Sequence, residues 1–351
     1  MSKLFSTLAA IAICTISLNA QTFSTPESVE YDVAGNRWFV GMTGSHAILQ
    51  HSPGSNTLLP FATGCTSGPH GLEIMGTTLY ACDGGRIRGF DLATGTMTFN
   101  LNLSASFLNG LTSDGSMYLF ATDYSAKKIY RICPSTNTFN VMCTTTKTPN
   151  GIYYDGPNNR LVYVTWGSNA PVQQMLLSDS TFSTVLATSM GSCDGITRDA
   201  AGYWYVTAWS GNQLWRIDPA LSAAPVSVLT GLSSPADIDI NSAGDSIGIP
   251  NSVNPGSITY YTLPTSIQAQ TATETGSAYP VPATTSAHIA LGNSVQNGTC
   301  EVYDMSGKLV STQNFSGDTC DVNRENLPNG TYMVVIREAD RIVLRSQIVF
   351  E

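Results

Sequence analysis

The stretch 192–209 reads SCDGITRDAAGYWYVTAW, and five other stretches of the chain follow the same plan. Each places a small or polar residue before a short apolar run, then a turn, then a second alternating run. The others are TPESVEYDVAGNRWFVG (25–41), GPHGLEIMGTTLYACDG (68–84), FLNGLTSDGSMYLFATD (107–123), TPNGIYYDGPNNRLVYVTW (148–166) and SPADIDINSAGDSIGIPN (234–251). The aligned apolar positions, spaced 43, 39, 41, 44 and 42 residues apart, are Val29, Leu72, Leu111, Ile152, Ile196 and Ile238.

A period near 40 residues that holds four short strands is typical of a β-propeller blade. Each repeat continues with third and fourth runs, such as KKIYRICPSTNTFNVMC (127–143). The sequence therefore predicts an all-β protein with a six-bladed β-propeller over residues 21–265. A solenoid is the competing interpretation, but solenoid repeats of this length are usually helical, and these are not. For the fourth strand of the last blade, either SIQAQTA (266–272) supplies it or QTFST (21–25) closes the ring.

The N-terminal segment MSKLFSTLAAIAICTISLNA (1–20) has one lysine, an apolar run and a terminal alanine. This pattern predicts a secretory signal peptide. No other apolar run approaches the roughly 18 residues of a membrane-spanning helix, so we expect an exported protein without a transmembrane segment. The net charge of −9 and the scattered basic residues argue against a nucleic-acid partner.

Seven cysteines remain after the signal peptide, an odd number for an oxidising compartment. Cys133 and Cys143 flank a turn between two strand-like runs, which favours a cross-hairpin disulfide. Cys300 and Cys320 form a second predicted pair. At most two of the remaining three can pair, and no CxxC spacing supports a zinc site on them; these are Cys65, Cys82 and Cys193.

The composition changes after Thr265, where a polar, turn-prone stretch over 266–278 indicates a linker. Residues 279–351 then alternate as strands with glycine turns and predict a small β-sandwich. Its run from YPVP through VYDMSGKLV and LPNGTY to a final strand resembles the type A sorting domain of the type IX secretion system. It departs from that family at Val281, where asparagine is usual. The resemblance implies that type IX secretion machinery is a partner and that the product is secreted or attached to the cell surface.

A ring of polar residues is expected at one end of the propeller channel. The innermost strand of each blade starts on one face, so the residues just ahead of these strands point toward a common axis. Blade by blade they are Glu27, His70, Asn109, Asn150, Asp194 and Ala236. Converging carboxylates are costly unless a cation balances them. Oxygen donors favour Ca²⁺, with Mg²⁺, Mn²⁺ or Zn²⁺ behind it. The alternative interpretation is that each residue only forms a turn.

The pattern of Glu27, Asn109, Asn150 and Asp194 resembles the senescence-marker-protein/gluconolactonase family and the related paraoxonases. That resemblance implies that these four residues ligate a catalytic divalent cation and that His70, in GPHGL, matches a paraoxonase histidine. No second histidine follows near Cys82, and PESV lacks the glycine that usually follows the glutamate. NHL-repeat propellers, which are mostly non-enzymatic, share the blade pattern.

The ends of the second strands should lie on the same face as the ring. Trp166 and Trp209 there could form an aromatic wall for a substrate, or they pack between blades. Asp83 and Asp123 occupy the same position and either face the substrate or brace turns.

Two functions remain open from the sequence. The leading hypothesis is an exported, cation-dependent hydrolase of a lactone or ester, in which His70 or Asp194 acts as general base. The alternative is a non-catalytic NHL-like propeller that binds a glycan or protein at the cell surface. No nucleophile elbow, Walker loop, HExxH or Rossmann glycine motif is present.

Overall fold

The computed structural model describes residues 22–55, 57–263, 276–305, 308–338 and 341–351. The chain divides into two compact units, Met1–Pro264 and Thr265–Glu351. Both are built of β-strands, and among the described residues the helices amount to two three-residue 3-10 turns, Pro134–Thr136 and Gly156–Asn158. The predicted signal peptide and most of the predicted linker lie outside the described residues.

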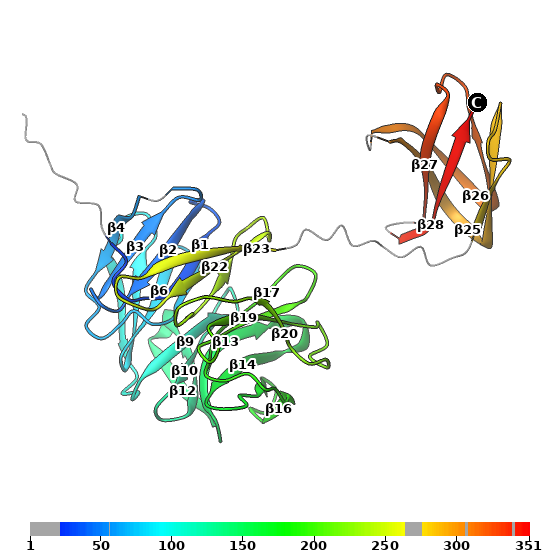
Figure 1. Cartoon of the computed structure of the whole chain (residues 1–351). Coiled ribbons are helices and arrows are strands. Elements are labelled where there is room, and N and C mark those ends of the chain that lie inside the picture. The colour runs from blue at the N-terminus through cyan, green and yellow to red at the C-terminus, as the bar shows by residue number, and fades with distance from the viewer. Residues whose placement is uncertain (1–21, 56, 264–275, 306–307, 339–340) are drawn as a thin grey trace, which may run out of the picture. The chain divides into compact units, whose positions relative to one another are not determined.

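The first unit contains one sheet per sequence repeat, each antiparallel with its strands in chain order (Figure 1). Blade one comprises β1 (Pro26–Asp32), β2 (Arg37–Met42), β3 (Ala47–His51) and β4 (Leu59–Thr63). Blade two comprises β5 (Leu72–Met75), β6 (Thr78–Asp83), β7 (Arg86–Asp91) and β8 (Met97–Asn102). Blade three comprises β9 (Leu108–Ser113), β10 (Leu119–Asp123), β11 (Lys128–Cys133) and β12 (Thr138–Thr144). Blade four comprises β13 (Thr148–Asp155), β14 (Arg160–Trp166), β15 (Val172–Leu176) and β16 (Phe182–Leu186). Blade five comprises β17 (Cys193–Arg198), β18 (Trp204–Ala208), β19 (Gln213–Ile217) and β20 (Val226–Leu229). Blade six comprises β21 (Asp239–Ile240), β22 (Ser246–Asn251) and β23 (Ser257–Thr262). This confirms the predicted all-β propeller.

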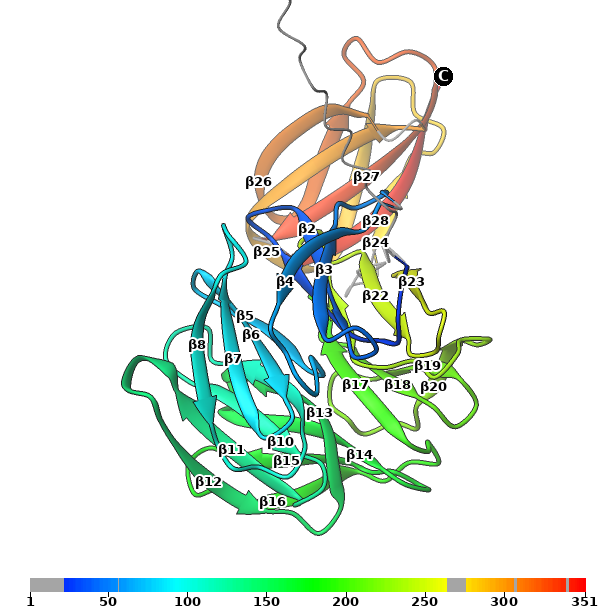
Figure 2. The ribbon, with the colours of Figure 1, turned by 90° about the vertical axis from the view of Figure 1, so that its left-hand side faces the viewer.

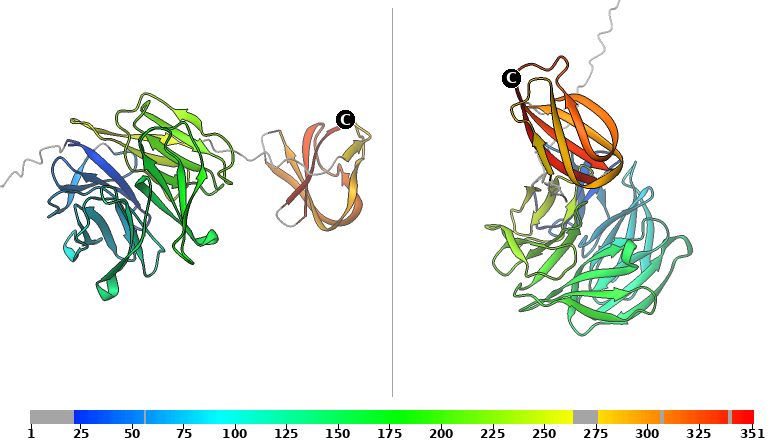
Figure 3. Two further views of the ribbon diagram at one scale, coloured as in Figure 1. Left: turned by 90° about the horizontal axis from the view of Figure 1, so that it is seen from below. Right: turned by 90° about the vertical axis from the view of Figure 1, so that its right-hand side faces the viewer.

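The hydrophobic core of the propeller lies between neighbouring blades. Phe39 of β2 and Leu79 of β6 belong to one buried cluster, and Phe120 of β10 and Leu161 of β14 belong to another. The alternation of buried and exposed residues fades in the second strands, which are almost wholly buried, as in β10 and β18. Strands covered on both faces read as continuous apolar runs. Figure 2 and the right-hand view of Figure 3 show the blades following one another in chain order around a common axis.

The glycines that follow the ring residues are required by close approach of backbones. A Cβ added to Gly71 would lie 2.3 Å from the Asn109 carbonyl oxygen of the next blade. A Cβ on Gly151 would lie 2.3 Å from the Asp194 carbonyl oxygen. Neither glycine has a positive φ. The repeated glycine therefore marks inner strands in contact around a narrow channel, rather than turns that need left-handed backbone.

The seam between the last and first blades is closed by side chains and short backbone contacts. Among the described residues, blade six has three strands, and no fourth strand pairs with β23. The candidate 266–272 lies outside the described residues. The other candidate contributes single hydrogen bonds, since the Phe23 carbonyl accepts from Gly256 N at 3.0 Å and the Thr25 carbonyl from Thr43 N at 3.1 Å. Tyr260 of β23 also donates to or accepts from His51 of β3 at 2.6 Å.

The second unit consists of β24 (Gly276–Tyr279), β25 (Ser286–Asp304), β26 (Leu309–Asn323), β27 (Gly330–Glu338) and β28 (Arg341–Phe350). Bulges interrupt the pairing of β25 with β26 between Ala290 and Gly298. The part of β25 before these bulges pairs with β24, and the part after them pairs with β27. One buried cluster, which includes Ile289, Val302 and Phe350, forms its core.

The structure has all seven described cysteines as free thiols, and it overturns the predicted Cys133–Cys143 disulfide. Cys133 lies opposite Thr138, whereas Cys143 lies opposite Ile129, four rungs further along the hairpin. At about 3.3 Å per residue, this offset is about 13 Å, well beyond the reach of a disulfide. Cys300 and Cys320 differ, because their buried side chains are in hydrogen-bond contact in the core of the second unit. A bond between them stays a prediction.

Candidate functional site

The ring residues of four blades sit in or beside β-bulges. In blade five, Cys193 pairs with Ala208 and Ile196 with Val206, so Asp194 and Gly195 together face a single residue of β18. Equivalent register shifts occur beside Glu27, at Asn109–Gly110 and at Asn150–Gly151. A bulge bends the strand locally and re-aims its side chains. The ring residues in these four blades therefore lie within the inner strands, rather than just ahead of them as predicted.

Threonines of the second strands hold two of these bulges in place. The hydroxyl of Thr207 accepts a hydrogen bond from Gly195 N at 2.7 Å and donates to the Ala236 carbonyl of blade six at 2.8 Å. Thr122 accepts from Gly110 N at 2.9 Å and donates to the Asn150 carbonyl of blade four at 2.7 Å. Each threonine thus fixes a bulge and joins it to the next blade.

Five of the six predicted ring residues line one pocket of about 240 Å³. Its lining consists of Glu27, His70, Phe107, Asn109, Tyr124, Asn150, Trp166, Asp194 and Trp209. The four predicted metal ligands, both predicted catalytic residues and both tryptophans are in this set. Phe107 and Tyr124 were missed by the sequence reasoning, although Tyr124 directly follows the end of a second strand.

Residues that line this pocket carry buried polar atoms that form no hydrogen bond of normal geometry: Asn150 Oδ1, Asp194 Oδ1, His70 Nδ1 and Trp209 Nε1. Trp209 and Asn150 lie close enough to Asp194 to oppose the rise in its pKa. Two donors orient the oxygens: Asn150 Nδ2 donates to the Cys193 carbonyl at 3.1 Å, and Ser252 Oγ donates to Glu27 Oε2 at 2.6 Å. Buried polar groups are normally paired. Unpaired acceptors that share a pocket are what a site for a cation or a hydrogen-bonding ligand requires.

The electrostatics of the pocket oppose charge on its own side chains. Burial raises the pKa of Asp194 well above its usual range, and repulsion from Glu27 and Asp237 adds to the rise. Burial also raises the pKa of Glu27, against the hydrogen bond from Ser252. Burial lowers the pKa of His70 to about 4, so the imidazole is neutral at pH 7. A bound cation would instead favour the ionised form of both carboxyls.

A continuous series of aromatic rings borders the pocket along blades two to five. His70 contacts Phe107 edge to face with centroids 4.6 Å apart, and Phe107 contacts Tyr124 at 5.8 Å. Tyr124 is 6.0 Å from Trp166, which is 5.3 Å from Trp209. The two tryptophans therefore contact each other across blades and also line the pocket, and their role as a wall for a substrate stays a prediction.

Asp83 and Asp123 do not line the pocket, and their predicted substrate role is corrected. Asp83 is buried and accepts hydrogen bonds from the backbone of residues 66–68 and from Arg88. Burial alone would raise its pKa, but these bonds lower the pKa to about 2. Asp123 accepts from Ser106 N at 2.7 Å and Phe107 N at 3.1 Å. Each aspartate shapes the loop that leads into an inner strand.

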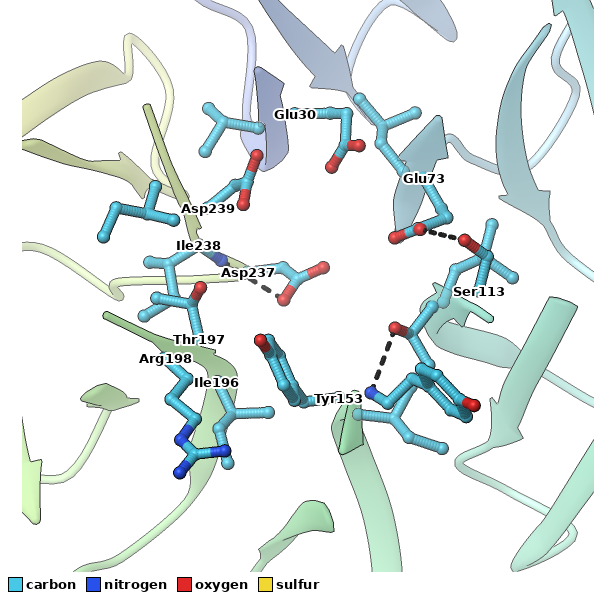
Figure 4. Close-up of a pocket in the computed structure, with 17 residues that line it drawn as sticks. Glu30, Glu73, Ser113, Tyr153, Ile196, Thr197, Arg198, Asp237, Ile238 and Asp239 are labelled. Carbon is cyan, nitrogen blue, oxygen red and sulfur yellow. Dashed lines mark hydrogen bonds between the residues drawn. The ribbon is translucent and has the colours of Figure 1, made fainter. Parts of the chain in front are cut away.

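A second pocket, of about 290 Å³, lies further along the inner strands and was not predicted (Figure 4). Four carboxylates reach into it, from Glu30, Glu73, Asp237 and Asp239. The sequence signal was present, since three of them directly follow an aligned apolar position and the fourth, Asp237, directly precedes one. We refer to this pocket as the acidic chamber.

Among the residues that the structure describes, no three His, Cys, Asp or Glu side chains come together in a way that could hold a metal ion. A cation in the ring pocket would need the amide oxygens of Asn109 and Asn150 to complete its shell. Within the same described ranges, no helix is long and apolar enough to cross a membrane.

Comparisons of the whole chain with solved structures return propellers of low sequence identity. A gluconolactonase from Xanthomonas campestris aligns with a TM-score of 0.58 at 14% identity, covering 69% of this chain and 87% of that one. A luciferin-regenerating enzyme aligns with a TM-score of 0.59 at 12% identity, covering 70% and 93%. A chain of a nidogen/laminin complex aligns with a TM-score of 0.51 at 14% identity, covering 59% and 80%. These likenesses show the fold alone.

Family models assign both units of the chain, while none of the curated proteins matches the sequence. Residues 277–351 match the model described as a secretion system C-terminal sorting domain, which confirms export by type IX secretion, to the cell surface or beyond it. Residues 25–228, more than half of the chain, match the model described as an SMP-30/gluconolactonase/LRE-like region. The chain therefore belongs to the SMP-30/gluconolactonase/LRE-like family.

Proposed function

We propose that the chain is an exported, cation-dependent hydrolase of a lactone or ester, with its active site in the ring pocket. The observation that carries the proposal is the set of buried, unpartnered atoms at Asn150, Asp194 and His70 in one pocket. Family membership supports the same reaction class.

Four side chains would hold the cation: Glu27, Asn109, Asn150 and Asp194. Their donors are all oxygens, two from carboxylates, which suits Ca²⁺ best and balances a divalent charge. When bound, such an ion supplies Lewis-acid activation of the carbonyl and of water. Ser252 and the Cys193 carbonyl fix the orientation of Glu27 and Asn150 for this role.

His70 would accept a proton from the attacking water at Nδ1, which has no other partner. Because burial lowers its pKa to about 4, the imidazole is unprotonated across the neutral range and available as a base. The aromatic rings of Trp166 and Trp209 would hold the apolar face of the substrate and exclude water from that side.

The test is hydrolysis of simple lactones and aryl esters by the purified chain, with Ca²⁺ or with EDTA. We expect turnover that requires the cation and is lost in Asp194→Ala. Trp209→Phe should keep turnover while raising KM. Equal activity in wild type and Asp194→Ala would contradict the assignment.

The aromatic border also favours a second candidate, the binding of a glycan without catalysis, because sugar rings stack on such surfaces. In that case Ca²⁺ would stabilise the propeller strongly while no lactone or ester is hydrolysed.

A further inference from the structure

Side chains at one repeated position connect neighbouring blades. The position directly after the aligned apolar residue holds Glu30, Glu73, Thr112, Tyr153, Thr197 and Asp239. In four of the blades this side chain accepts a hydrogen bond from the inner strand of the next blade. The repeat thus places an acceptor where two inner strands meet.

The contacts follow one another around the ring. Asp239 Oδ2 of blade six accepts from Tyr31 N of blade one at 2.8 Å. Glu30 Oε1 of blade one accepts from Ile74 N of blade two at 2.8 Å.

The series continues into blades three and four. Glu73 Oε1 of blade two accepts from Ser113 Oγ of blade three at 2.6 Å. Thr112 Oγ1 of blade three accepts from Tyr154 N of blade four at 3.2 Å. Three consecutive interfaces, from blade six to blade three, therefore depend on carboxyl groups.

These three carboxyls share the acidic chamber with one another. Figure 4 shows Glu30, Glu73 and Asp239 directed toward one space, with Asp237 between them. Of the other strands around the chamber, β9 contributes hydroxyls, β13 contributes Tyr153 and β17 contributes Arg198.

No cation neutralises the three carboxyls within the described residues. The guanidinium of Arg198 pairs with Asp155 Oδ1 at 3.2 Å and donates through Nε to the Gly202 carbonyl at 3.1 Å. None of the ion pairs formed by the described residues includes a chamber carboxylate. Glu30 accepts from a backbone N–H and Glu73 from a hydroxyl. Ionised neighbours in such a space repel one another.

We propose that these carboxyls couple closure of the propeller to proton binding, so that the interfaces joining blades six, one, two and three weaken as pH rises. A protonated carboxyl still accepts the hydrogen bond from the neighbouring blade, and it carries no charge against its neighbours. This coupling is independent of the proposed hydrolase activity because it involves none of the ring residues.

The pKa values support the direction of this coupling. Burial raises the pKa of Glu73 to about 8 and that of Asp239 to about 6. Burial, then repulsion from Asp239 and from Glu73, raises the pKa of Glu30 well above its usual range. The folded chain thus binds protons that the unfolded chain has released above about pH 5, so stability is greatest in mild acid and falls as pH rises through 6 to 8.

The experiment measures urea unfolding of the full chain from pH 5 to pH 9 in EDTA, followed by tryptophan fluorescence. All five tryptophans lie in the propeller, so the signal reports that unit alone. Each proton released on unfolding raises the unfolding constant about tenfold per pH unit. In wild type we expect the unfolding constant to rise between pH 6 and pH 8, with contributions from Glu30 and Glu73 and also from Asp194 and Asp237, whose pKa values burial likewise raises.

Glu73→Gln keeps the Oε1 acceptor for Ser113 but cannot titrate, and it should lower that slope by about one proton. The control is Asp91→Asn, which alters an exposed turn carboxyl whose pKa is lowered by hydrogen bonds from Thr94; it should leave the slope above pH 6 unchanged. A wild-type unfolding constant that is flat or falls with pH would overturn the proposal without any variant. So would an unchanged slope in folded Glu73→Gln.

Discussion

Asp194→Asn should make the propeller more stable without a cation and less stable with one. In the structure the Asp194 carboxyl is 2% exposed and its Oδ1 has no hydrogen-bond partner. Because its pKa is raised, the folded chain keeps this carboxyl protonated at neutral pH while the unfolded chain releases the proton, which costs stability. Asparagine has no proton to release and removes this cost. In EDTA we therefore expect the variant to gain about 1–3 kcal/mol of unfolding free energy.

With Ca²⁺ at a hundred times its Kd, wild type should gain about 2.7 kcal/mol by mass action. For a unit of this size, that corresponds to a rise in Tm of about 5–10 °C. Asp194→Asn removes one of two carboxylates from the proposed shell, so at the same Ca²⁺ concentration it should gain little. The two proteins should change order of stability between EDTA and Ca²⁺.

The assay is a pair of thermal melts, followed by tryptophan fluorescence, for each protein. The matched control is Asp123→Asn, which alters a buried aspartate outside the proposed cation shell and weakens its hydrogen bonds to Ser106 N and Phe107 N. It should lower Tm equally in both conditions. If Asp194→Asn shows the full Ca²⁺-dependent shift of wild type, the cation does not bind where we propose.

Further predictions test the channel wall and the sorting unit. Gly151→Ala should cost about 1–3 kcal/mol in chemical denaturation, because its Cβ would lie 2.3 Å from the Asp194 carbonyl oxygen. A Cβ on Gly76 would meet no atom within 4 Å, and its φ is +65°, so Gly76→Ala should lower the unfolding free energy by about 1 kcal/mol. Equal losses in the two variants would contradict the close-approach argument. In the exported protein, Cys300 and Cys320 should resist alkylation until a reductant is added. Alkylation of both in denaturant without a reductant would show that they remain thiols.

The repeat carried most of what could be predicted about the fold. A polar residue before a glycine recurs in blades two to five, and the aligned apolar residue recurs at near-constant spacing in all six, which identifies the inner strand of every blade. The same alignment predicted that Glu27, Asn109, Asn150 and Asp194 lie close together, because equivalent positions of a closed ring of blades face a common axis. All four line one pocket. The glycine itself was open to two interpretations, and only the packing of Gly151 against the next blade distinguishes them.

Other features depend on strand register, which periodicity does not fix. Cys133 and Cys143 flank one hairpin in sequence, yet the register of β11 and β12 separates them by four rungs. The bulges beside the ring residues depend on single hydrogen bonds such as Thr207 to Gly195. The acidic chamber was not predicted, because alternation within one strand does not show that Glu30, Glu73 and Asp239 converge from three different blades.

The backbone contacts between successive inner strands also bear on how this chain can change over evolution. Gly71, Gly110 and Gly151 each leave room for one carbonyl of the following blade, so an insertion near the channel would have to be matched in two blades at once. The outer strands, such as β8 and β12, are half exposed along their length and carry no such constraint. We therefore expect substitutions and loop insertions to be tolerated at the outer strands and selected against at the inner strands that line the channel.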